Sequence, residues 1–158
     1  MVVAVGDRGD ALPVGRPAWA PNGRSVLALA AGPHGRYDEL VTFTANGGNA
    51  KQWKAKTSFR APGIQSAAWV GNDRVAVLAG APAHLRLLAR RPNGSFSPIK
   101  DFPALTGFEL AATGHYLALR RENDANGDGA MVLLDVNRPQ PRIRNLTSGV
   151  NPAWATAP

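Results

Sequence analysis

The 158-residue sequence contains no cysteine, which excludes disulfide frameworks, cysteine-ligated zinc, iron–sulfur clusters and thiol catalysis. It also lacks a long apolar run. The longest uncharged apolar stretch, residues 26–33, is far shorter than the roughly 20 residues that a membrane-spanning helix needs. The first residues carry no basic leader and do not resemble a signal peptide. We therefore expect a chain without a membrane span.

Helical periodicity is absent as well, because no segment of a dozen residues keeps apolar side chains at the spacing of one helix face. The sequence is instead rich in residues that interrupt helices, with 17 glycines and 13 prolines. Many short strands joined by tight turns use glycine and proline in this number. The composition therefore predicts an all-β fold.

A repeated pattern organises the strands. Residues 16–29 predict a short strand ending in Trp19, a Pro-Asn-Gly turn and an apolar strand. Residues 66–78 repeat the two strands around Trp69, with Gly71-Asn72-Asp73 at the turn. A weaker copy has Leu110 in place of the tryptophan, and Asn151-Pro152-Ala153-Trp154-Ala155 begins another. The intervals are 50, 41 and 44 residues, close to the length of a four-stranded propeller blade. We expect the large side chains at these positions to pack between blades, with ligand stacking as the alternative.

The second half of each unit adds two more strands, so the repeat divides the chain into three four-stranded antiparallel blades. The expected blades are residues 16–60, 64–104 and 106–148, with partial blade strands at 1–15 and 149–158 of one propeller domain. A closed ring needs at least four blades. The sequence therefore predicts a partial propeller, or one completed by further blades of the same or another chain.

The unit Pro17-Ala18-Trp19-Ala20-Pro21-Asn22-Gly23-Arg24 resembles the Pro-x-Trp-Ser-Pro-Asp-Gly-Arg signature of the TolB-like, or PD40 (WD40-like), β-propeller repeats. The Asp124-Ala125-Asn126-Gly127-Asp128-Gly129 segment is similar to hairpin insertions of that family. The resemblance implies a propeller that presents loops or a channel to a protein partner. It also implies an extracytoplasmic location, although a cytoplasmic one stays open.

The chain has a net charge of +7, and the whole excess of positive charge comes from residues 51–100, which hold nine basic residues and one acidic residue. Cations interleaved with an aromatic residue are typical of surfaces that bind nucleic acids or other polyanions. A solvated strand face is the simpler interpretation of the same pattern. The candidate polyanion-binding residues are Lys51, Trp53, Lys54, Lys56, Arg86, Arg90 and Arg91.

One acidic loop fits part of a calcium-binding pattern. Asp124, Asn126 and Asp128 alternate as calcium ligands do, and Asp135 follows eleven residues after Asp124. An ordinary polar hairpin explains the Asn-Gly and Asp-Gly pairs equally well. Calcium is accordingly the one cofactor that the sequence suggests, with these four residues as candidate ligands.

No catalytic motif accompanies the repeat: the sequence has neither a Gly-x-Ser-x-Gly elbow nor a phosphate-binding glycine loop. His34, His84 and His115 lie in different units, and we expect His115 in a surface turn. From these observations we expect a non-catalytic module that binds proteins or scaffolds an assembly. The alternatives are an accessory domain of a hydrolase or peptidase and a polyanion-binding surface.

Overall fold

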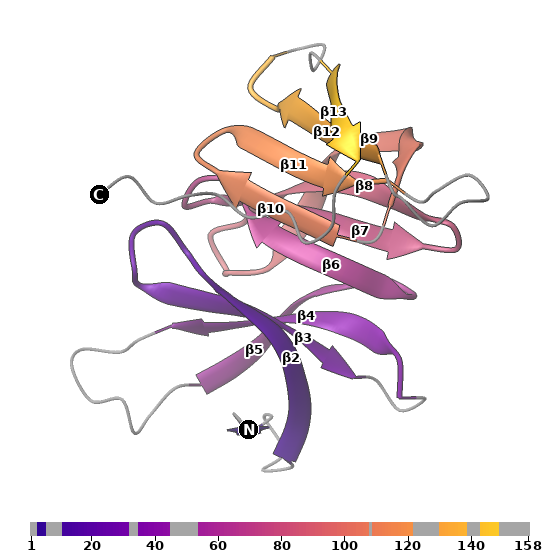
Figure 1. Ribbon diagram of the computed structural model, residues 1–158. Coiled ribbons are helices and arrows are strands. Elements are labelled where there is room, and N and C mark those ends of the chain that lie inside the picture. The colour runs from indigo at the N-terminus through magenta and orange to yellow at the C-terminus, as the bar shows by residue number, and fades with distance from the viewer. Residues whose placement is uncertain are drawn as a thin grey trace.

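The computed structural model describes residues 3–5, 11–31, 35–44, 54–107, 109–121, 130–138 and 143–148, and in them the chain forms three antiparallel sheets (Figure 1). Each sheet is a meander of consecutive strands, with the order β1-β2-β3-β4-β5, β6-β7-β8-β9 and β10-β11-β12-β13. The all-β fold of propeller blades that the sequence predicts is confirmed. The strands are β1 Val3–Val5, β2 Ala11–Trp19, β3 Ser25–Ala31, β4 Tyr37–Thr44, β5 Lys54–Arg60, β6 Ile64–Trp69, β7 Arg74–Gly80, β8 Ala83–Arg90, β9 Phe96–Thr106, β10 Glu109–Thr113, β11 Tyr116–Arg120, β12 Ala130–Asp135 and β13 Ile143–Ser148.

The three sheets stack face against face, and we call them the first (β1–β5), second (β6–β9) and third (β10–β13) blades (Figure 1). Successive side chains of a strand point to opposite faces, so the second blade contributes to two cores. Val75 and Val77 pack toward the first blade, while Ala76 and Leu78 pack toward the third. All four are fully buried, which explains why β7 reads as a continuous apolar run.

Two of the predicted turns have the backbone that their glycines allow. Gly23 closes the turn between β2 and β3 with φ of 66°, and Gly94 closes the turn between β8 and β9 with φ of 84°. Residues with a Cβ rarely adopt these positive values, so Pro-Asn-Gly at both places fixes where the strands reverse.

The expected partial blade at residues 1–15 is not a separate unit. β2 runs without interruption from Ala11 to Trp19 and pairs with β3 from Val14 onward, so its first half belongs to the first blade. β1 pairs with the start of β2 and also contacts β5, so the five-stranded sheet curls on itself. The sequence pattern suggested a break here because Gly15 and Pro17 flank residue 16, where the predicted blade begins, although the strand continues through both. The other expected partial blade, 149–158, lies outside the described residues.

Trp69 packs between blades as predicted, with 4% of its surface exposed. Trp19 occupies the same position in the first blade and is 59% exposed, so the expectation that it packs between blades is wrong. Trp154 lies outside the described residues. Leu110 is not at the tryptophan position. In the first two blades the tryptophan belongs to the second residue pair from the turn, Trp19 with Val26 and Trp69 with Val75. In the third blade the second pair from the turn is Ala112 with Leu117. The turn of the third blade is shorter, because Thr113 pairs directly with Tyr116. The residue that matches the tryptophans is therefore Ala112, two positions after Leu110.

Candidate active site on the third blade

The third blade has one face against the second blade and one face turned away from it. Leu117, Leu119, Val132 and Leu134 fill the core with the second blade. The alternate residues of β11 and β12, with their partners on β10 and β13, therefore form the opposite face, which we call the far face. Its members include Glu109, Tyr116, Ala118, Arg120, Leu133, Asp135 and Arg144.

A charged residue replaces leucine on this far face. Counted from the turn, Arg120 stands where the first blade has Leu29 and the second has Leu78, both of which are sealed between blades. The Arg120 guanidinium donates from Nη1 to Glu109 Oε2 at 3.3 Å. A buried charge is costly unless it is paired and hydrogen-bonded. The far face is therefore built differently from the two blade faces that meet an apolar neighbour.

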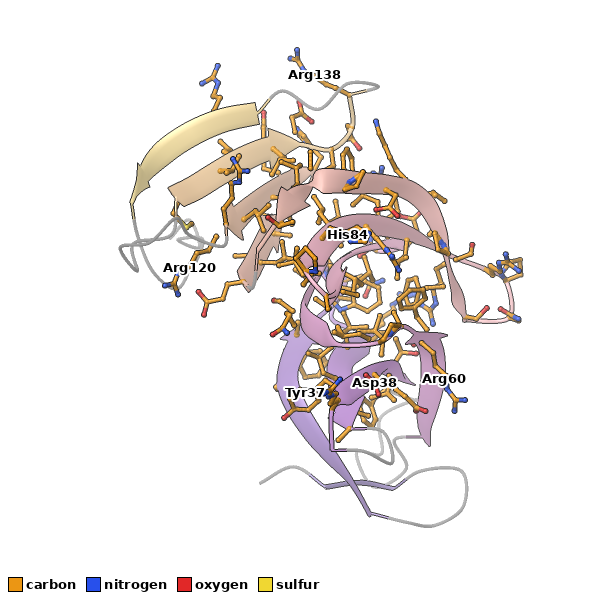
Figure 2. The ribbon with its side chains drawn as sticks, turned by 90° about the vertical axis from the view of Figure 1, so that its right-hand side faces the viewer. Tyr37, Asp38, Arg60, His84, Arg120 and Arg138 are labelled. Atoms are coloured by element: carbon orange, nitrogen blue, oxygen red, sulfur yellow. The ribbon has the colours of Figure 1, made fainter. Side chains whose placement is uncertain are left out.

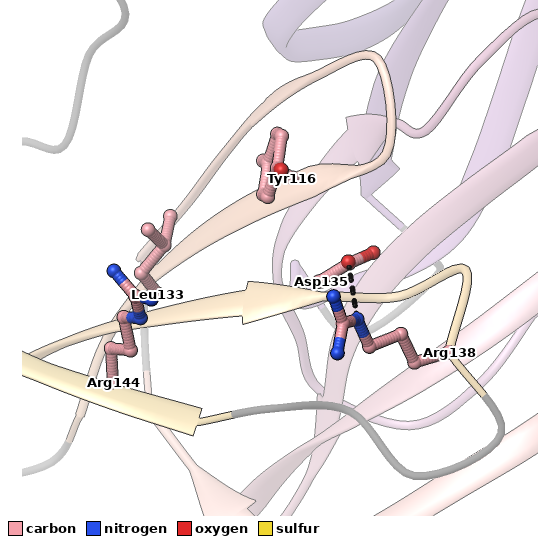
Figure 3. Close-up of a pocket in the computed structure, with 5 residues that line it drawn as sticks. All are labelled: Tyr116, Leu133, Asp135, Arg138 and Arg144. Atoms are coloured by element: carbon pink, nitrogen blue, oxygen red, sulfur yellow. Dashed lines mark hydrogen bonds and ion pairs between the residues drawn. The ribbon is translucent and has the colours of Figure 1, made fainter.

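A pocket of about 250 Å³ opens on the same face (Figure 3). β11 contributes Tyr116, β12 contributes Leu133 and Asp135, the following turn contributes Arg138, and β13 contributes Arg144. The strand register explains the arrangement: Tyr116 lies opposite Asp135, and Leu133 lies opposite Arg144. Two guanidinium groups, a carboxylate, a phenol and one apolar side chain thus converge on a small volume.

Asp135 is the hub of the polar contacts at this pocket. Its Oδ2 accepts from Arg138 Nε at 3.1 Å, and its Oδ1 accepts from the backbone N–H of Asn137 at 3.2 Å. The imidazole Nε2 of His115 lies 4.0 Å from Oδ1, an ion-pair distance rather than a hydrogen bond. His115 is a surface turn residue as predicted, and it packs on the ring of Tyr116 with centroids 4.2 Å apart.

Backbone and side-chain bonds hold this end of the blade in place. The backbone N–H of Val136 donates to the carbonyl of His115 at 3.0 Å, which ties the β10–β11 turn to the end of β12. Arg74 of the second blade donates from Nη2 to Asn137 Oδ1 at 2.8 Å. The loop that carries Arg138 is therefore anchored from two directions. An imidazole beside a fixed carboxylate, next to guanidinium groups, can transfer protons and stabilise a developing negative charge.

The predicted calcium site does not include Asp135. β12 begins at Ala130, next to the acidic loop, and Asp135 ends it five residues later, which is roughly 16 Å away along the strand. Its oxygens also face Arg138 and His115 rather than a cation site. Asp124, Asn126 and Asp128 lie outside the described residues, and the part of the chain that is described contains no cluster of three metal-binding side chains.

The predicted polyanion-binding residues are spread over two blades. Arg86 lies within β8 and contacts Asp101, with Nε 3.5 Å from Oδ2, whereas Arg90 ends β8 and Arg91 is exposed in the next turn. Lys54 and Lys56 belong to β5 of the first blade. Lys51 and Trp53 lie outside the described residues. Arg86 is thus already neutralised, which the charge count alone did not reveal.

A second histidine–carboxylate pair, His84 with Asp101, lies in the second blade (Figure 2, where His84 is labelled). His84 Nε2 is 3.0 Å from Asp101 Oδ1 and 3.1 Å from Arg86 Nε. Neither His84 nor Asp101 lines the pocket of the third blade. His34 lies outside the described residues.

The sequence interpretation missed five residues of the site: His115 and Tyr116 as functional groups, and Leu133, Arg138 and Arg144 altogether. One local signal was present. Asp135 and Arg138 are three residues apart around a strand end, a spacing at which an aspartate and an arginine pair across a turn. The other members come from β11 and β13, whose register the sequence does not reveal.

No family model matches the chain, and no curated protein matches it. Two solved structures share its fold. One is a candidate 6-phosphogluconolactonase from Bacteroides uniformis, with 11% identity and a TM-score of 0.56, covering 92% of this chain and 44% of that protein. The other is a candidate 6-phosphogluconolactonase from Bacteroides fragilis, with 13% identity and a TM-score of 0.55, covering 95% of this chain and 46% of that protein. The chain thus spans less than half the length of either protein.

These neighbours overturn the expectation of a non-catalytic binding or scaffolding module. That expectation rested on the propeller resemblance and on the absence of a catalytic motif, whereas solved structures with the same fold are named for an enzyme activity. The TolB-like resemblance, the extracytoplasmic location and the further blades stay predictions. In the described residues no helix has the length and apolar character needed to cross a membrane.

Proposed function

We propose that this chain is a hydrolase acting on a cyclic ester of the sugar-lactone type, with its active site at the pocket on the far face of the third blade. The observation that carries the proposal is the pair of contacts that His115 and Arg138 make with Asp135, whose carboxylate lines that pocket. The naming of two fold neighbours as lactonases supports the reaction class. All of these residues belong to the 158-residue chain, so the chain itself is the enzyme to test.

His115 would act as the general base. Its Nε2 is directed toward Asp135, which leaves Nδ1 to take a proton from water. The resulting hydroxide attacks the lactone carbonyl carbon, and the ring C–O bond breaks as the tetrahedral intermediate collapses. The proton then passes from His115 to the departing ring oxygen. One water molecule is consumed, and one open-chain hydroxy acid is formed.

Asp135 and Arg138 would support this step in different ways. Asp135 is held by Arg138 and by the Asn137 N–H, so its carboxylate keeps one orientation and stabilises the imidazolium that forms. Arg138 donates only through Nε in that contact and is 60% exposed, so its remaining N–H groups can face a negatively charged carbonyl oxygen. The arrangement supplies a base, an orienting carboxylate and a cation.

The test is a hydrolysis assay with the purified chain. The substrates are gluconolactone and its 6-phosphate, with acid release followed at constant pH and corrected for the spontaneous reaction. We expect saturable hydrolysis of at least one of them above the uncatalysed rate. A rate equal to the uncatalysed one for both lactones, from a chain shown to be folded, would contradict the proposal.

A further inference from the structure

The two arginines of the pocket differ in what they contact. Arg138 is bonded to Asp135, whereas no carboxylate of the described residues pairs with Arg144, which is exposed on β13. Figure 3 shows Arg144 beside Leu133 and away from the Asp135–Arg138 pair. Arg144 is therefore the cation that is available to an incoming anion, and its planar guanidinium suits a carboxylate or phosphate.

The strand register sets the distance between the two ends of the pocket. Arg144 lies opposite Leu133, and Leu133 and Asp135 are two residues apart on the same face of β12. Two residues of strand span about 7 Å. The apolar Leu133 side chain lies beside Arg144 at the cationic end, and Tyr116, opposite Asp135, lines the pocket from β11. An apolar surface with an aromatic ring beside it suits the ring of a sugar.

We infer that Arg144 anchors the anionic substituent of a ring-shaped ligand whose ring lies over Leu133 and beside Tyr116. The ligand class is a small cyclic polyol that carries a phosphate monoester or a carboxylate. The assignment of the opposite end to the reacting carbonyl rests on the proposed function, whereas the anion site rests on Arg144 alone. A pocket of about 250 Å³ is large enough for one such ring.

Binding of unreactive probes tests this inference without requiring hydrolysis. Glucose 6-phosphate, glucuronate and glucose are titrated into the chain by calorimetry at low salt. We expect an anionic probe to bind and glucose to bind at least about tenfold more weakly, since a charge-assisted contact is lost. The two anionic probes distinguish a phosphate from a carboxylate as the preferred group.

Two variants show whether the contact is specific. Arg144→Gln should lower the affinity for the anionic probe by about tenfold or more. Arg91→Gln, at an exposed arginine of the second blade, should leave that affinity unchanged. Equal affinity for glucose and the anions, no effect of Arg144→Gln, or an equal effect of Arg91→Gln would overturn the inference. Anion binding through Arg144 without lactone hydrolysis would refute the proposed function but support the anion site. Hydrolysis of the 6-phosphate with a KM that Arg144→Gln leaves unchanged would support the proposed function but refute the anion site.

Discussion

The indole of Trp69 donates from Nε1 to the backbone carbonyl of Ala18 at 3.0 Å, which joins the inner strand of the second blade to that of the first. Its ring also meets Phe96 edge to face, with centroids 5.8 Å apart and an interplanar angle of 66°. One side chain thus bonds a partly buried backbone carbonyl and fills the space between two sheets. Blade stacking in this chain depends on such contacts because consecutive blades share few backbone bonds.

Replacing Trp69 should therefore destabilise the fold. Trp69→Phe removes the bond to Ala18 and part of the buried ring, and we expect a loss of about 2 kcal/mol in the free energy of unfolding. Urea denaturation measures it. Trp19→Phe is the matched control, because the same repeat position is 59% exposed there and should cost less than about 0.5 kcal/mol. Equal losses in the two variants would contradict this account of blade packing.

Ser66 links the second and third blades. Its hydroxyl oxygen accepts from the backbone N–H of Leu110 at 3.2 Å, and its surface is 5% exposed. Ser66→Ala leaves that N–H without its acceptor and should cost about 1–2 kcal/mol in unfolding free energy. Ser97→Ala, on the outer strand β9, should change it by less than about 0.5 kcal/mol. If Ser66→Ala is as stable as the native chain, the bond does not hold the blades together.

Gly107 is required for close packing at the entrance to the third blade. A Cβ at this position would meet the carbonyl oxygen of Arg120 and lie 2.7 Å from Leu119 Cδ1. Since a backbone oxygen cannot move aside as a side chain does, Gly107→Ala should cost about 3 kcal/mol. Gly114→Asn is the comparison, because that glycine has open space and asparagine tolerates its φ of 53°. Thermal melts that rank the two variants in the opposite order would refute the packing argument.

Local sequence patterns predicted much of this fold for a physical reason. A Pro-Asn-Gly turn depends on neighbouring residues alone, so the turns ending at Gly23 and Gly94 could be predicted without tertiary information. The burial of Trp69 followed from the repeat. The course of β2 could not be predicted, because β1 pairs with its first half and only the pairing shows that Val14 already belongs to the first blade.

The candidate site was much less predictable. His115 was correctly expected in a turn, but its proximity to Asp135 depends on Tyr116 pairing with Asp135 across β11 and β12. These strands are joined by residues 121–129, whose composition fixes no register. Asp135 was consequently assigned to the acidic loop that is near in sequence, although it lies at the other end of the strand.

The corrected position of Asp135 makes a prediction about metal dependence. Melting temperatures of the native chain and of Asp135→Asn are compared with added calcium and with chelator. We expect whatever shift calcium produces to be the same in both proteins, because Asp135 is roughly 16 Å along β12 from the loop. A calcium-induced shift that disappears in Asp135→Asn would return Asp135 to the metal site.

The central claim is that His115 does chemistry at the far face of the third blade. The most direct measurement is kcat/KM for lactone hydrolysis, determined side by side for the native chain, His115→Gln and His84→Gln. His84 is the matched control, because it also contacts an aspartate, but that aspartate belongs to the second blade and does not line the pocket, whereas Asp135 does. We predict a loss of about 100-fold for His115→Gln and less than about twofold for His84→Gln. Equal activity of His115→Gln and the native chain would contradict the claim.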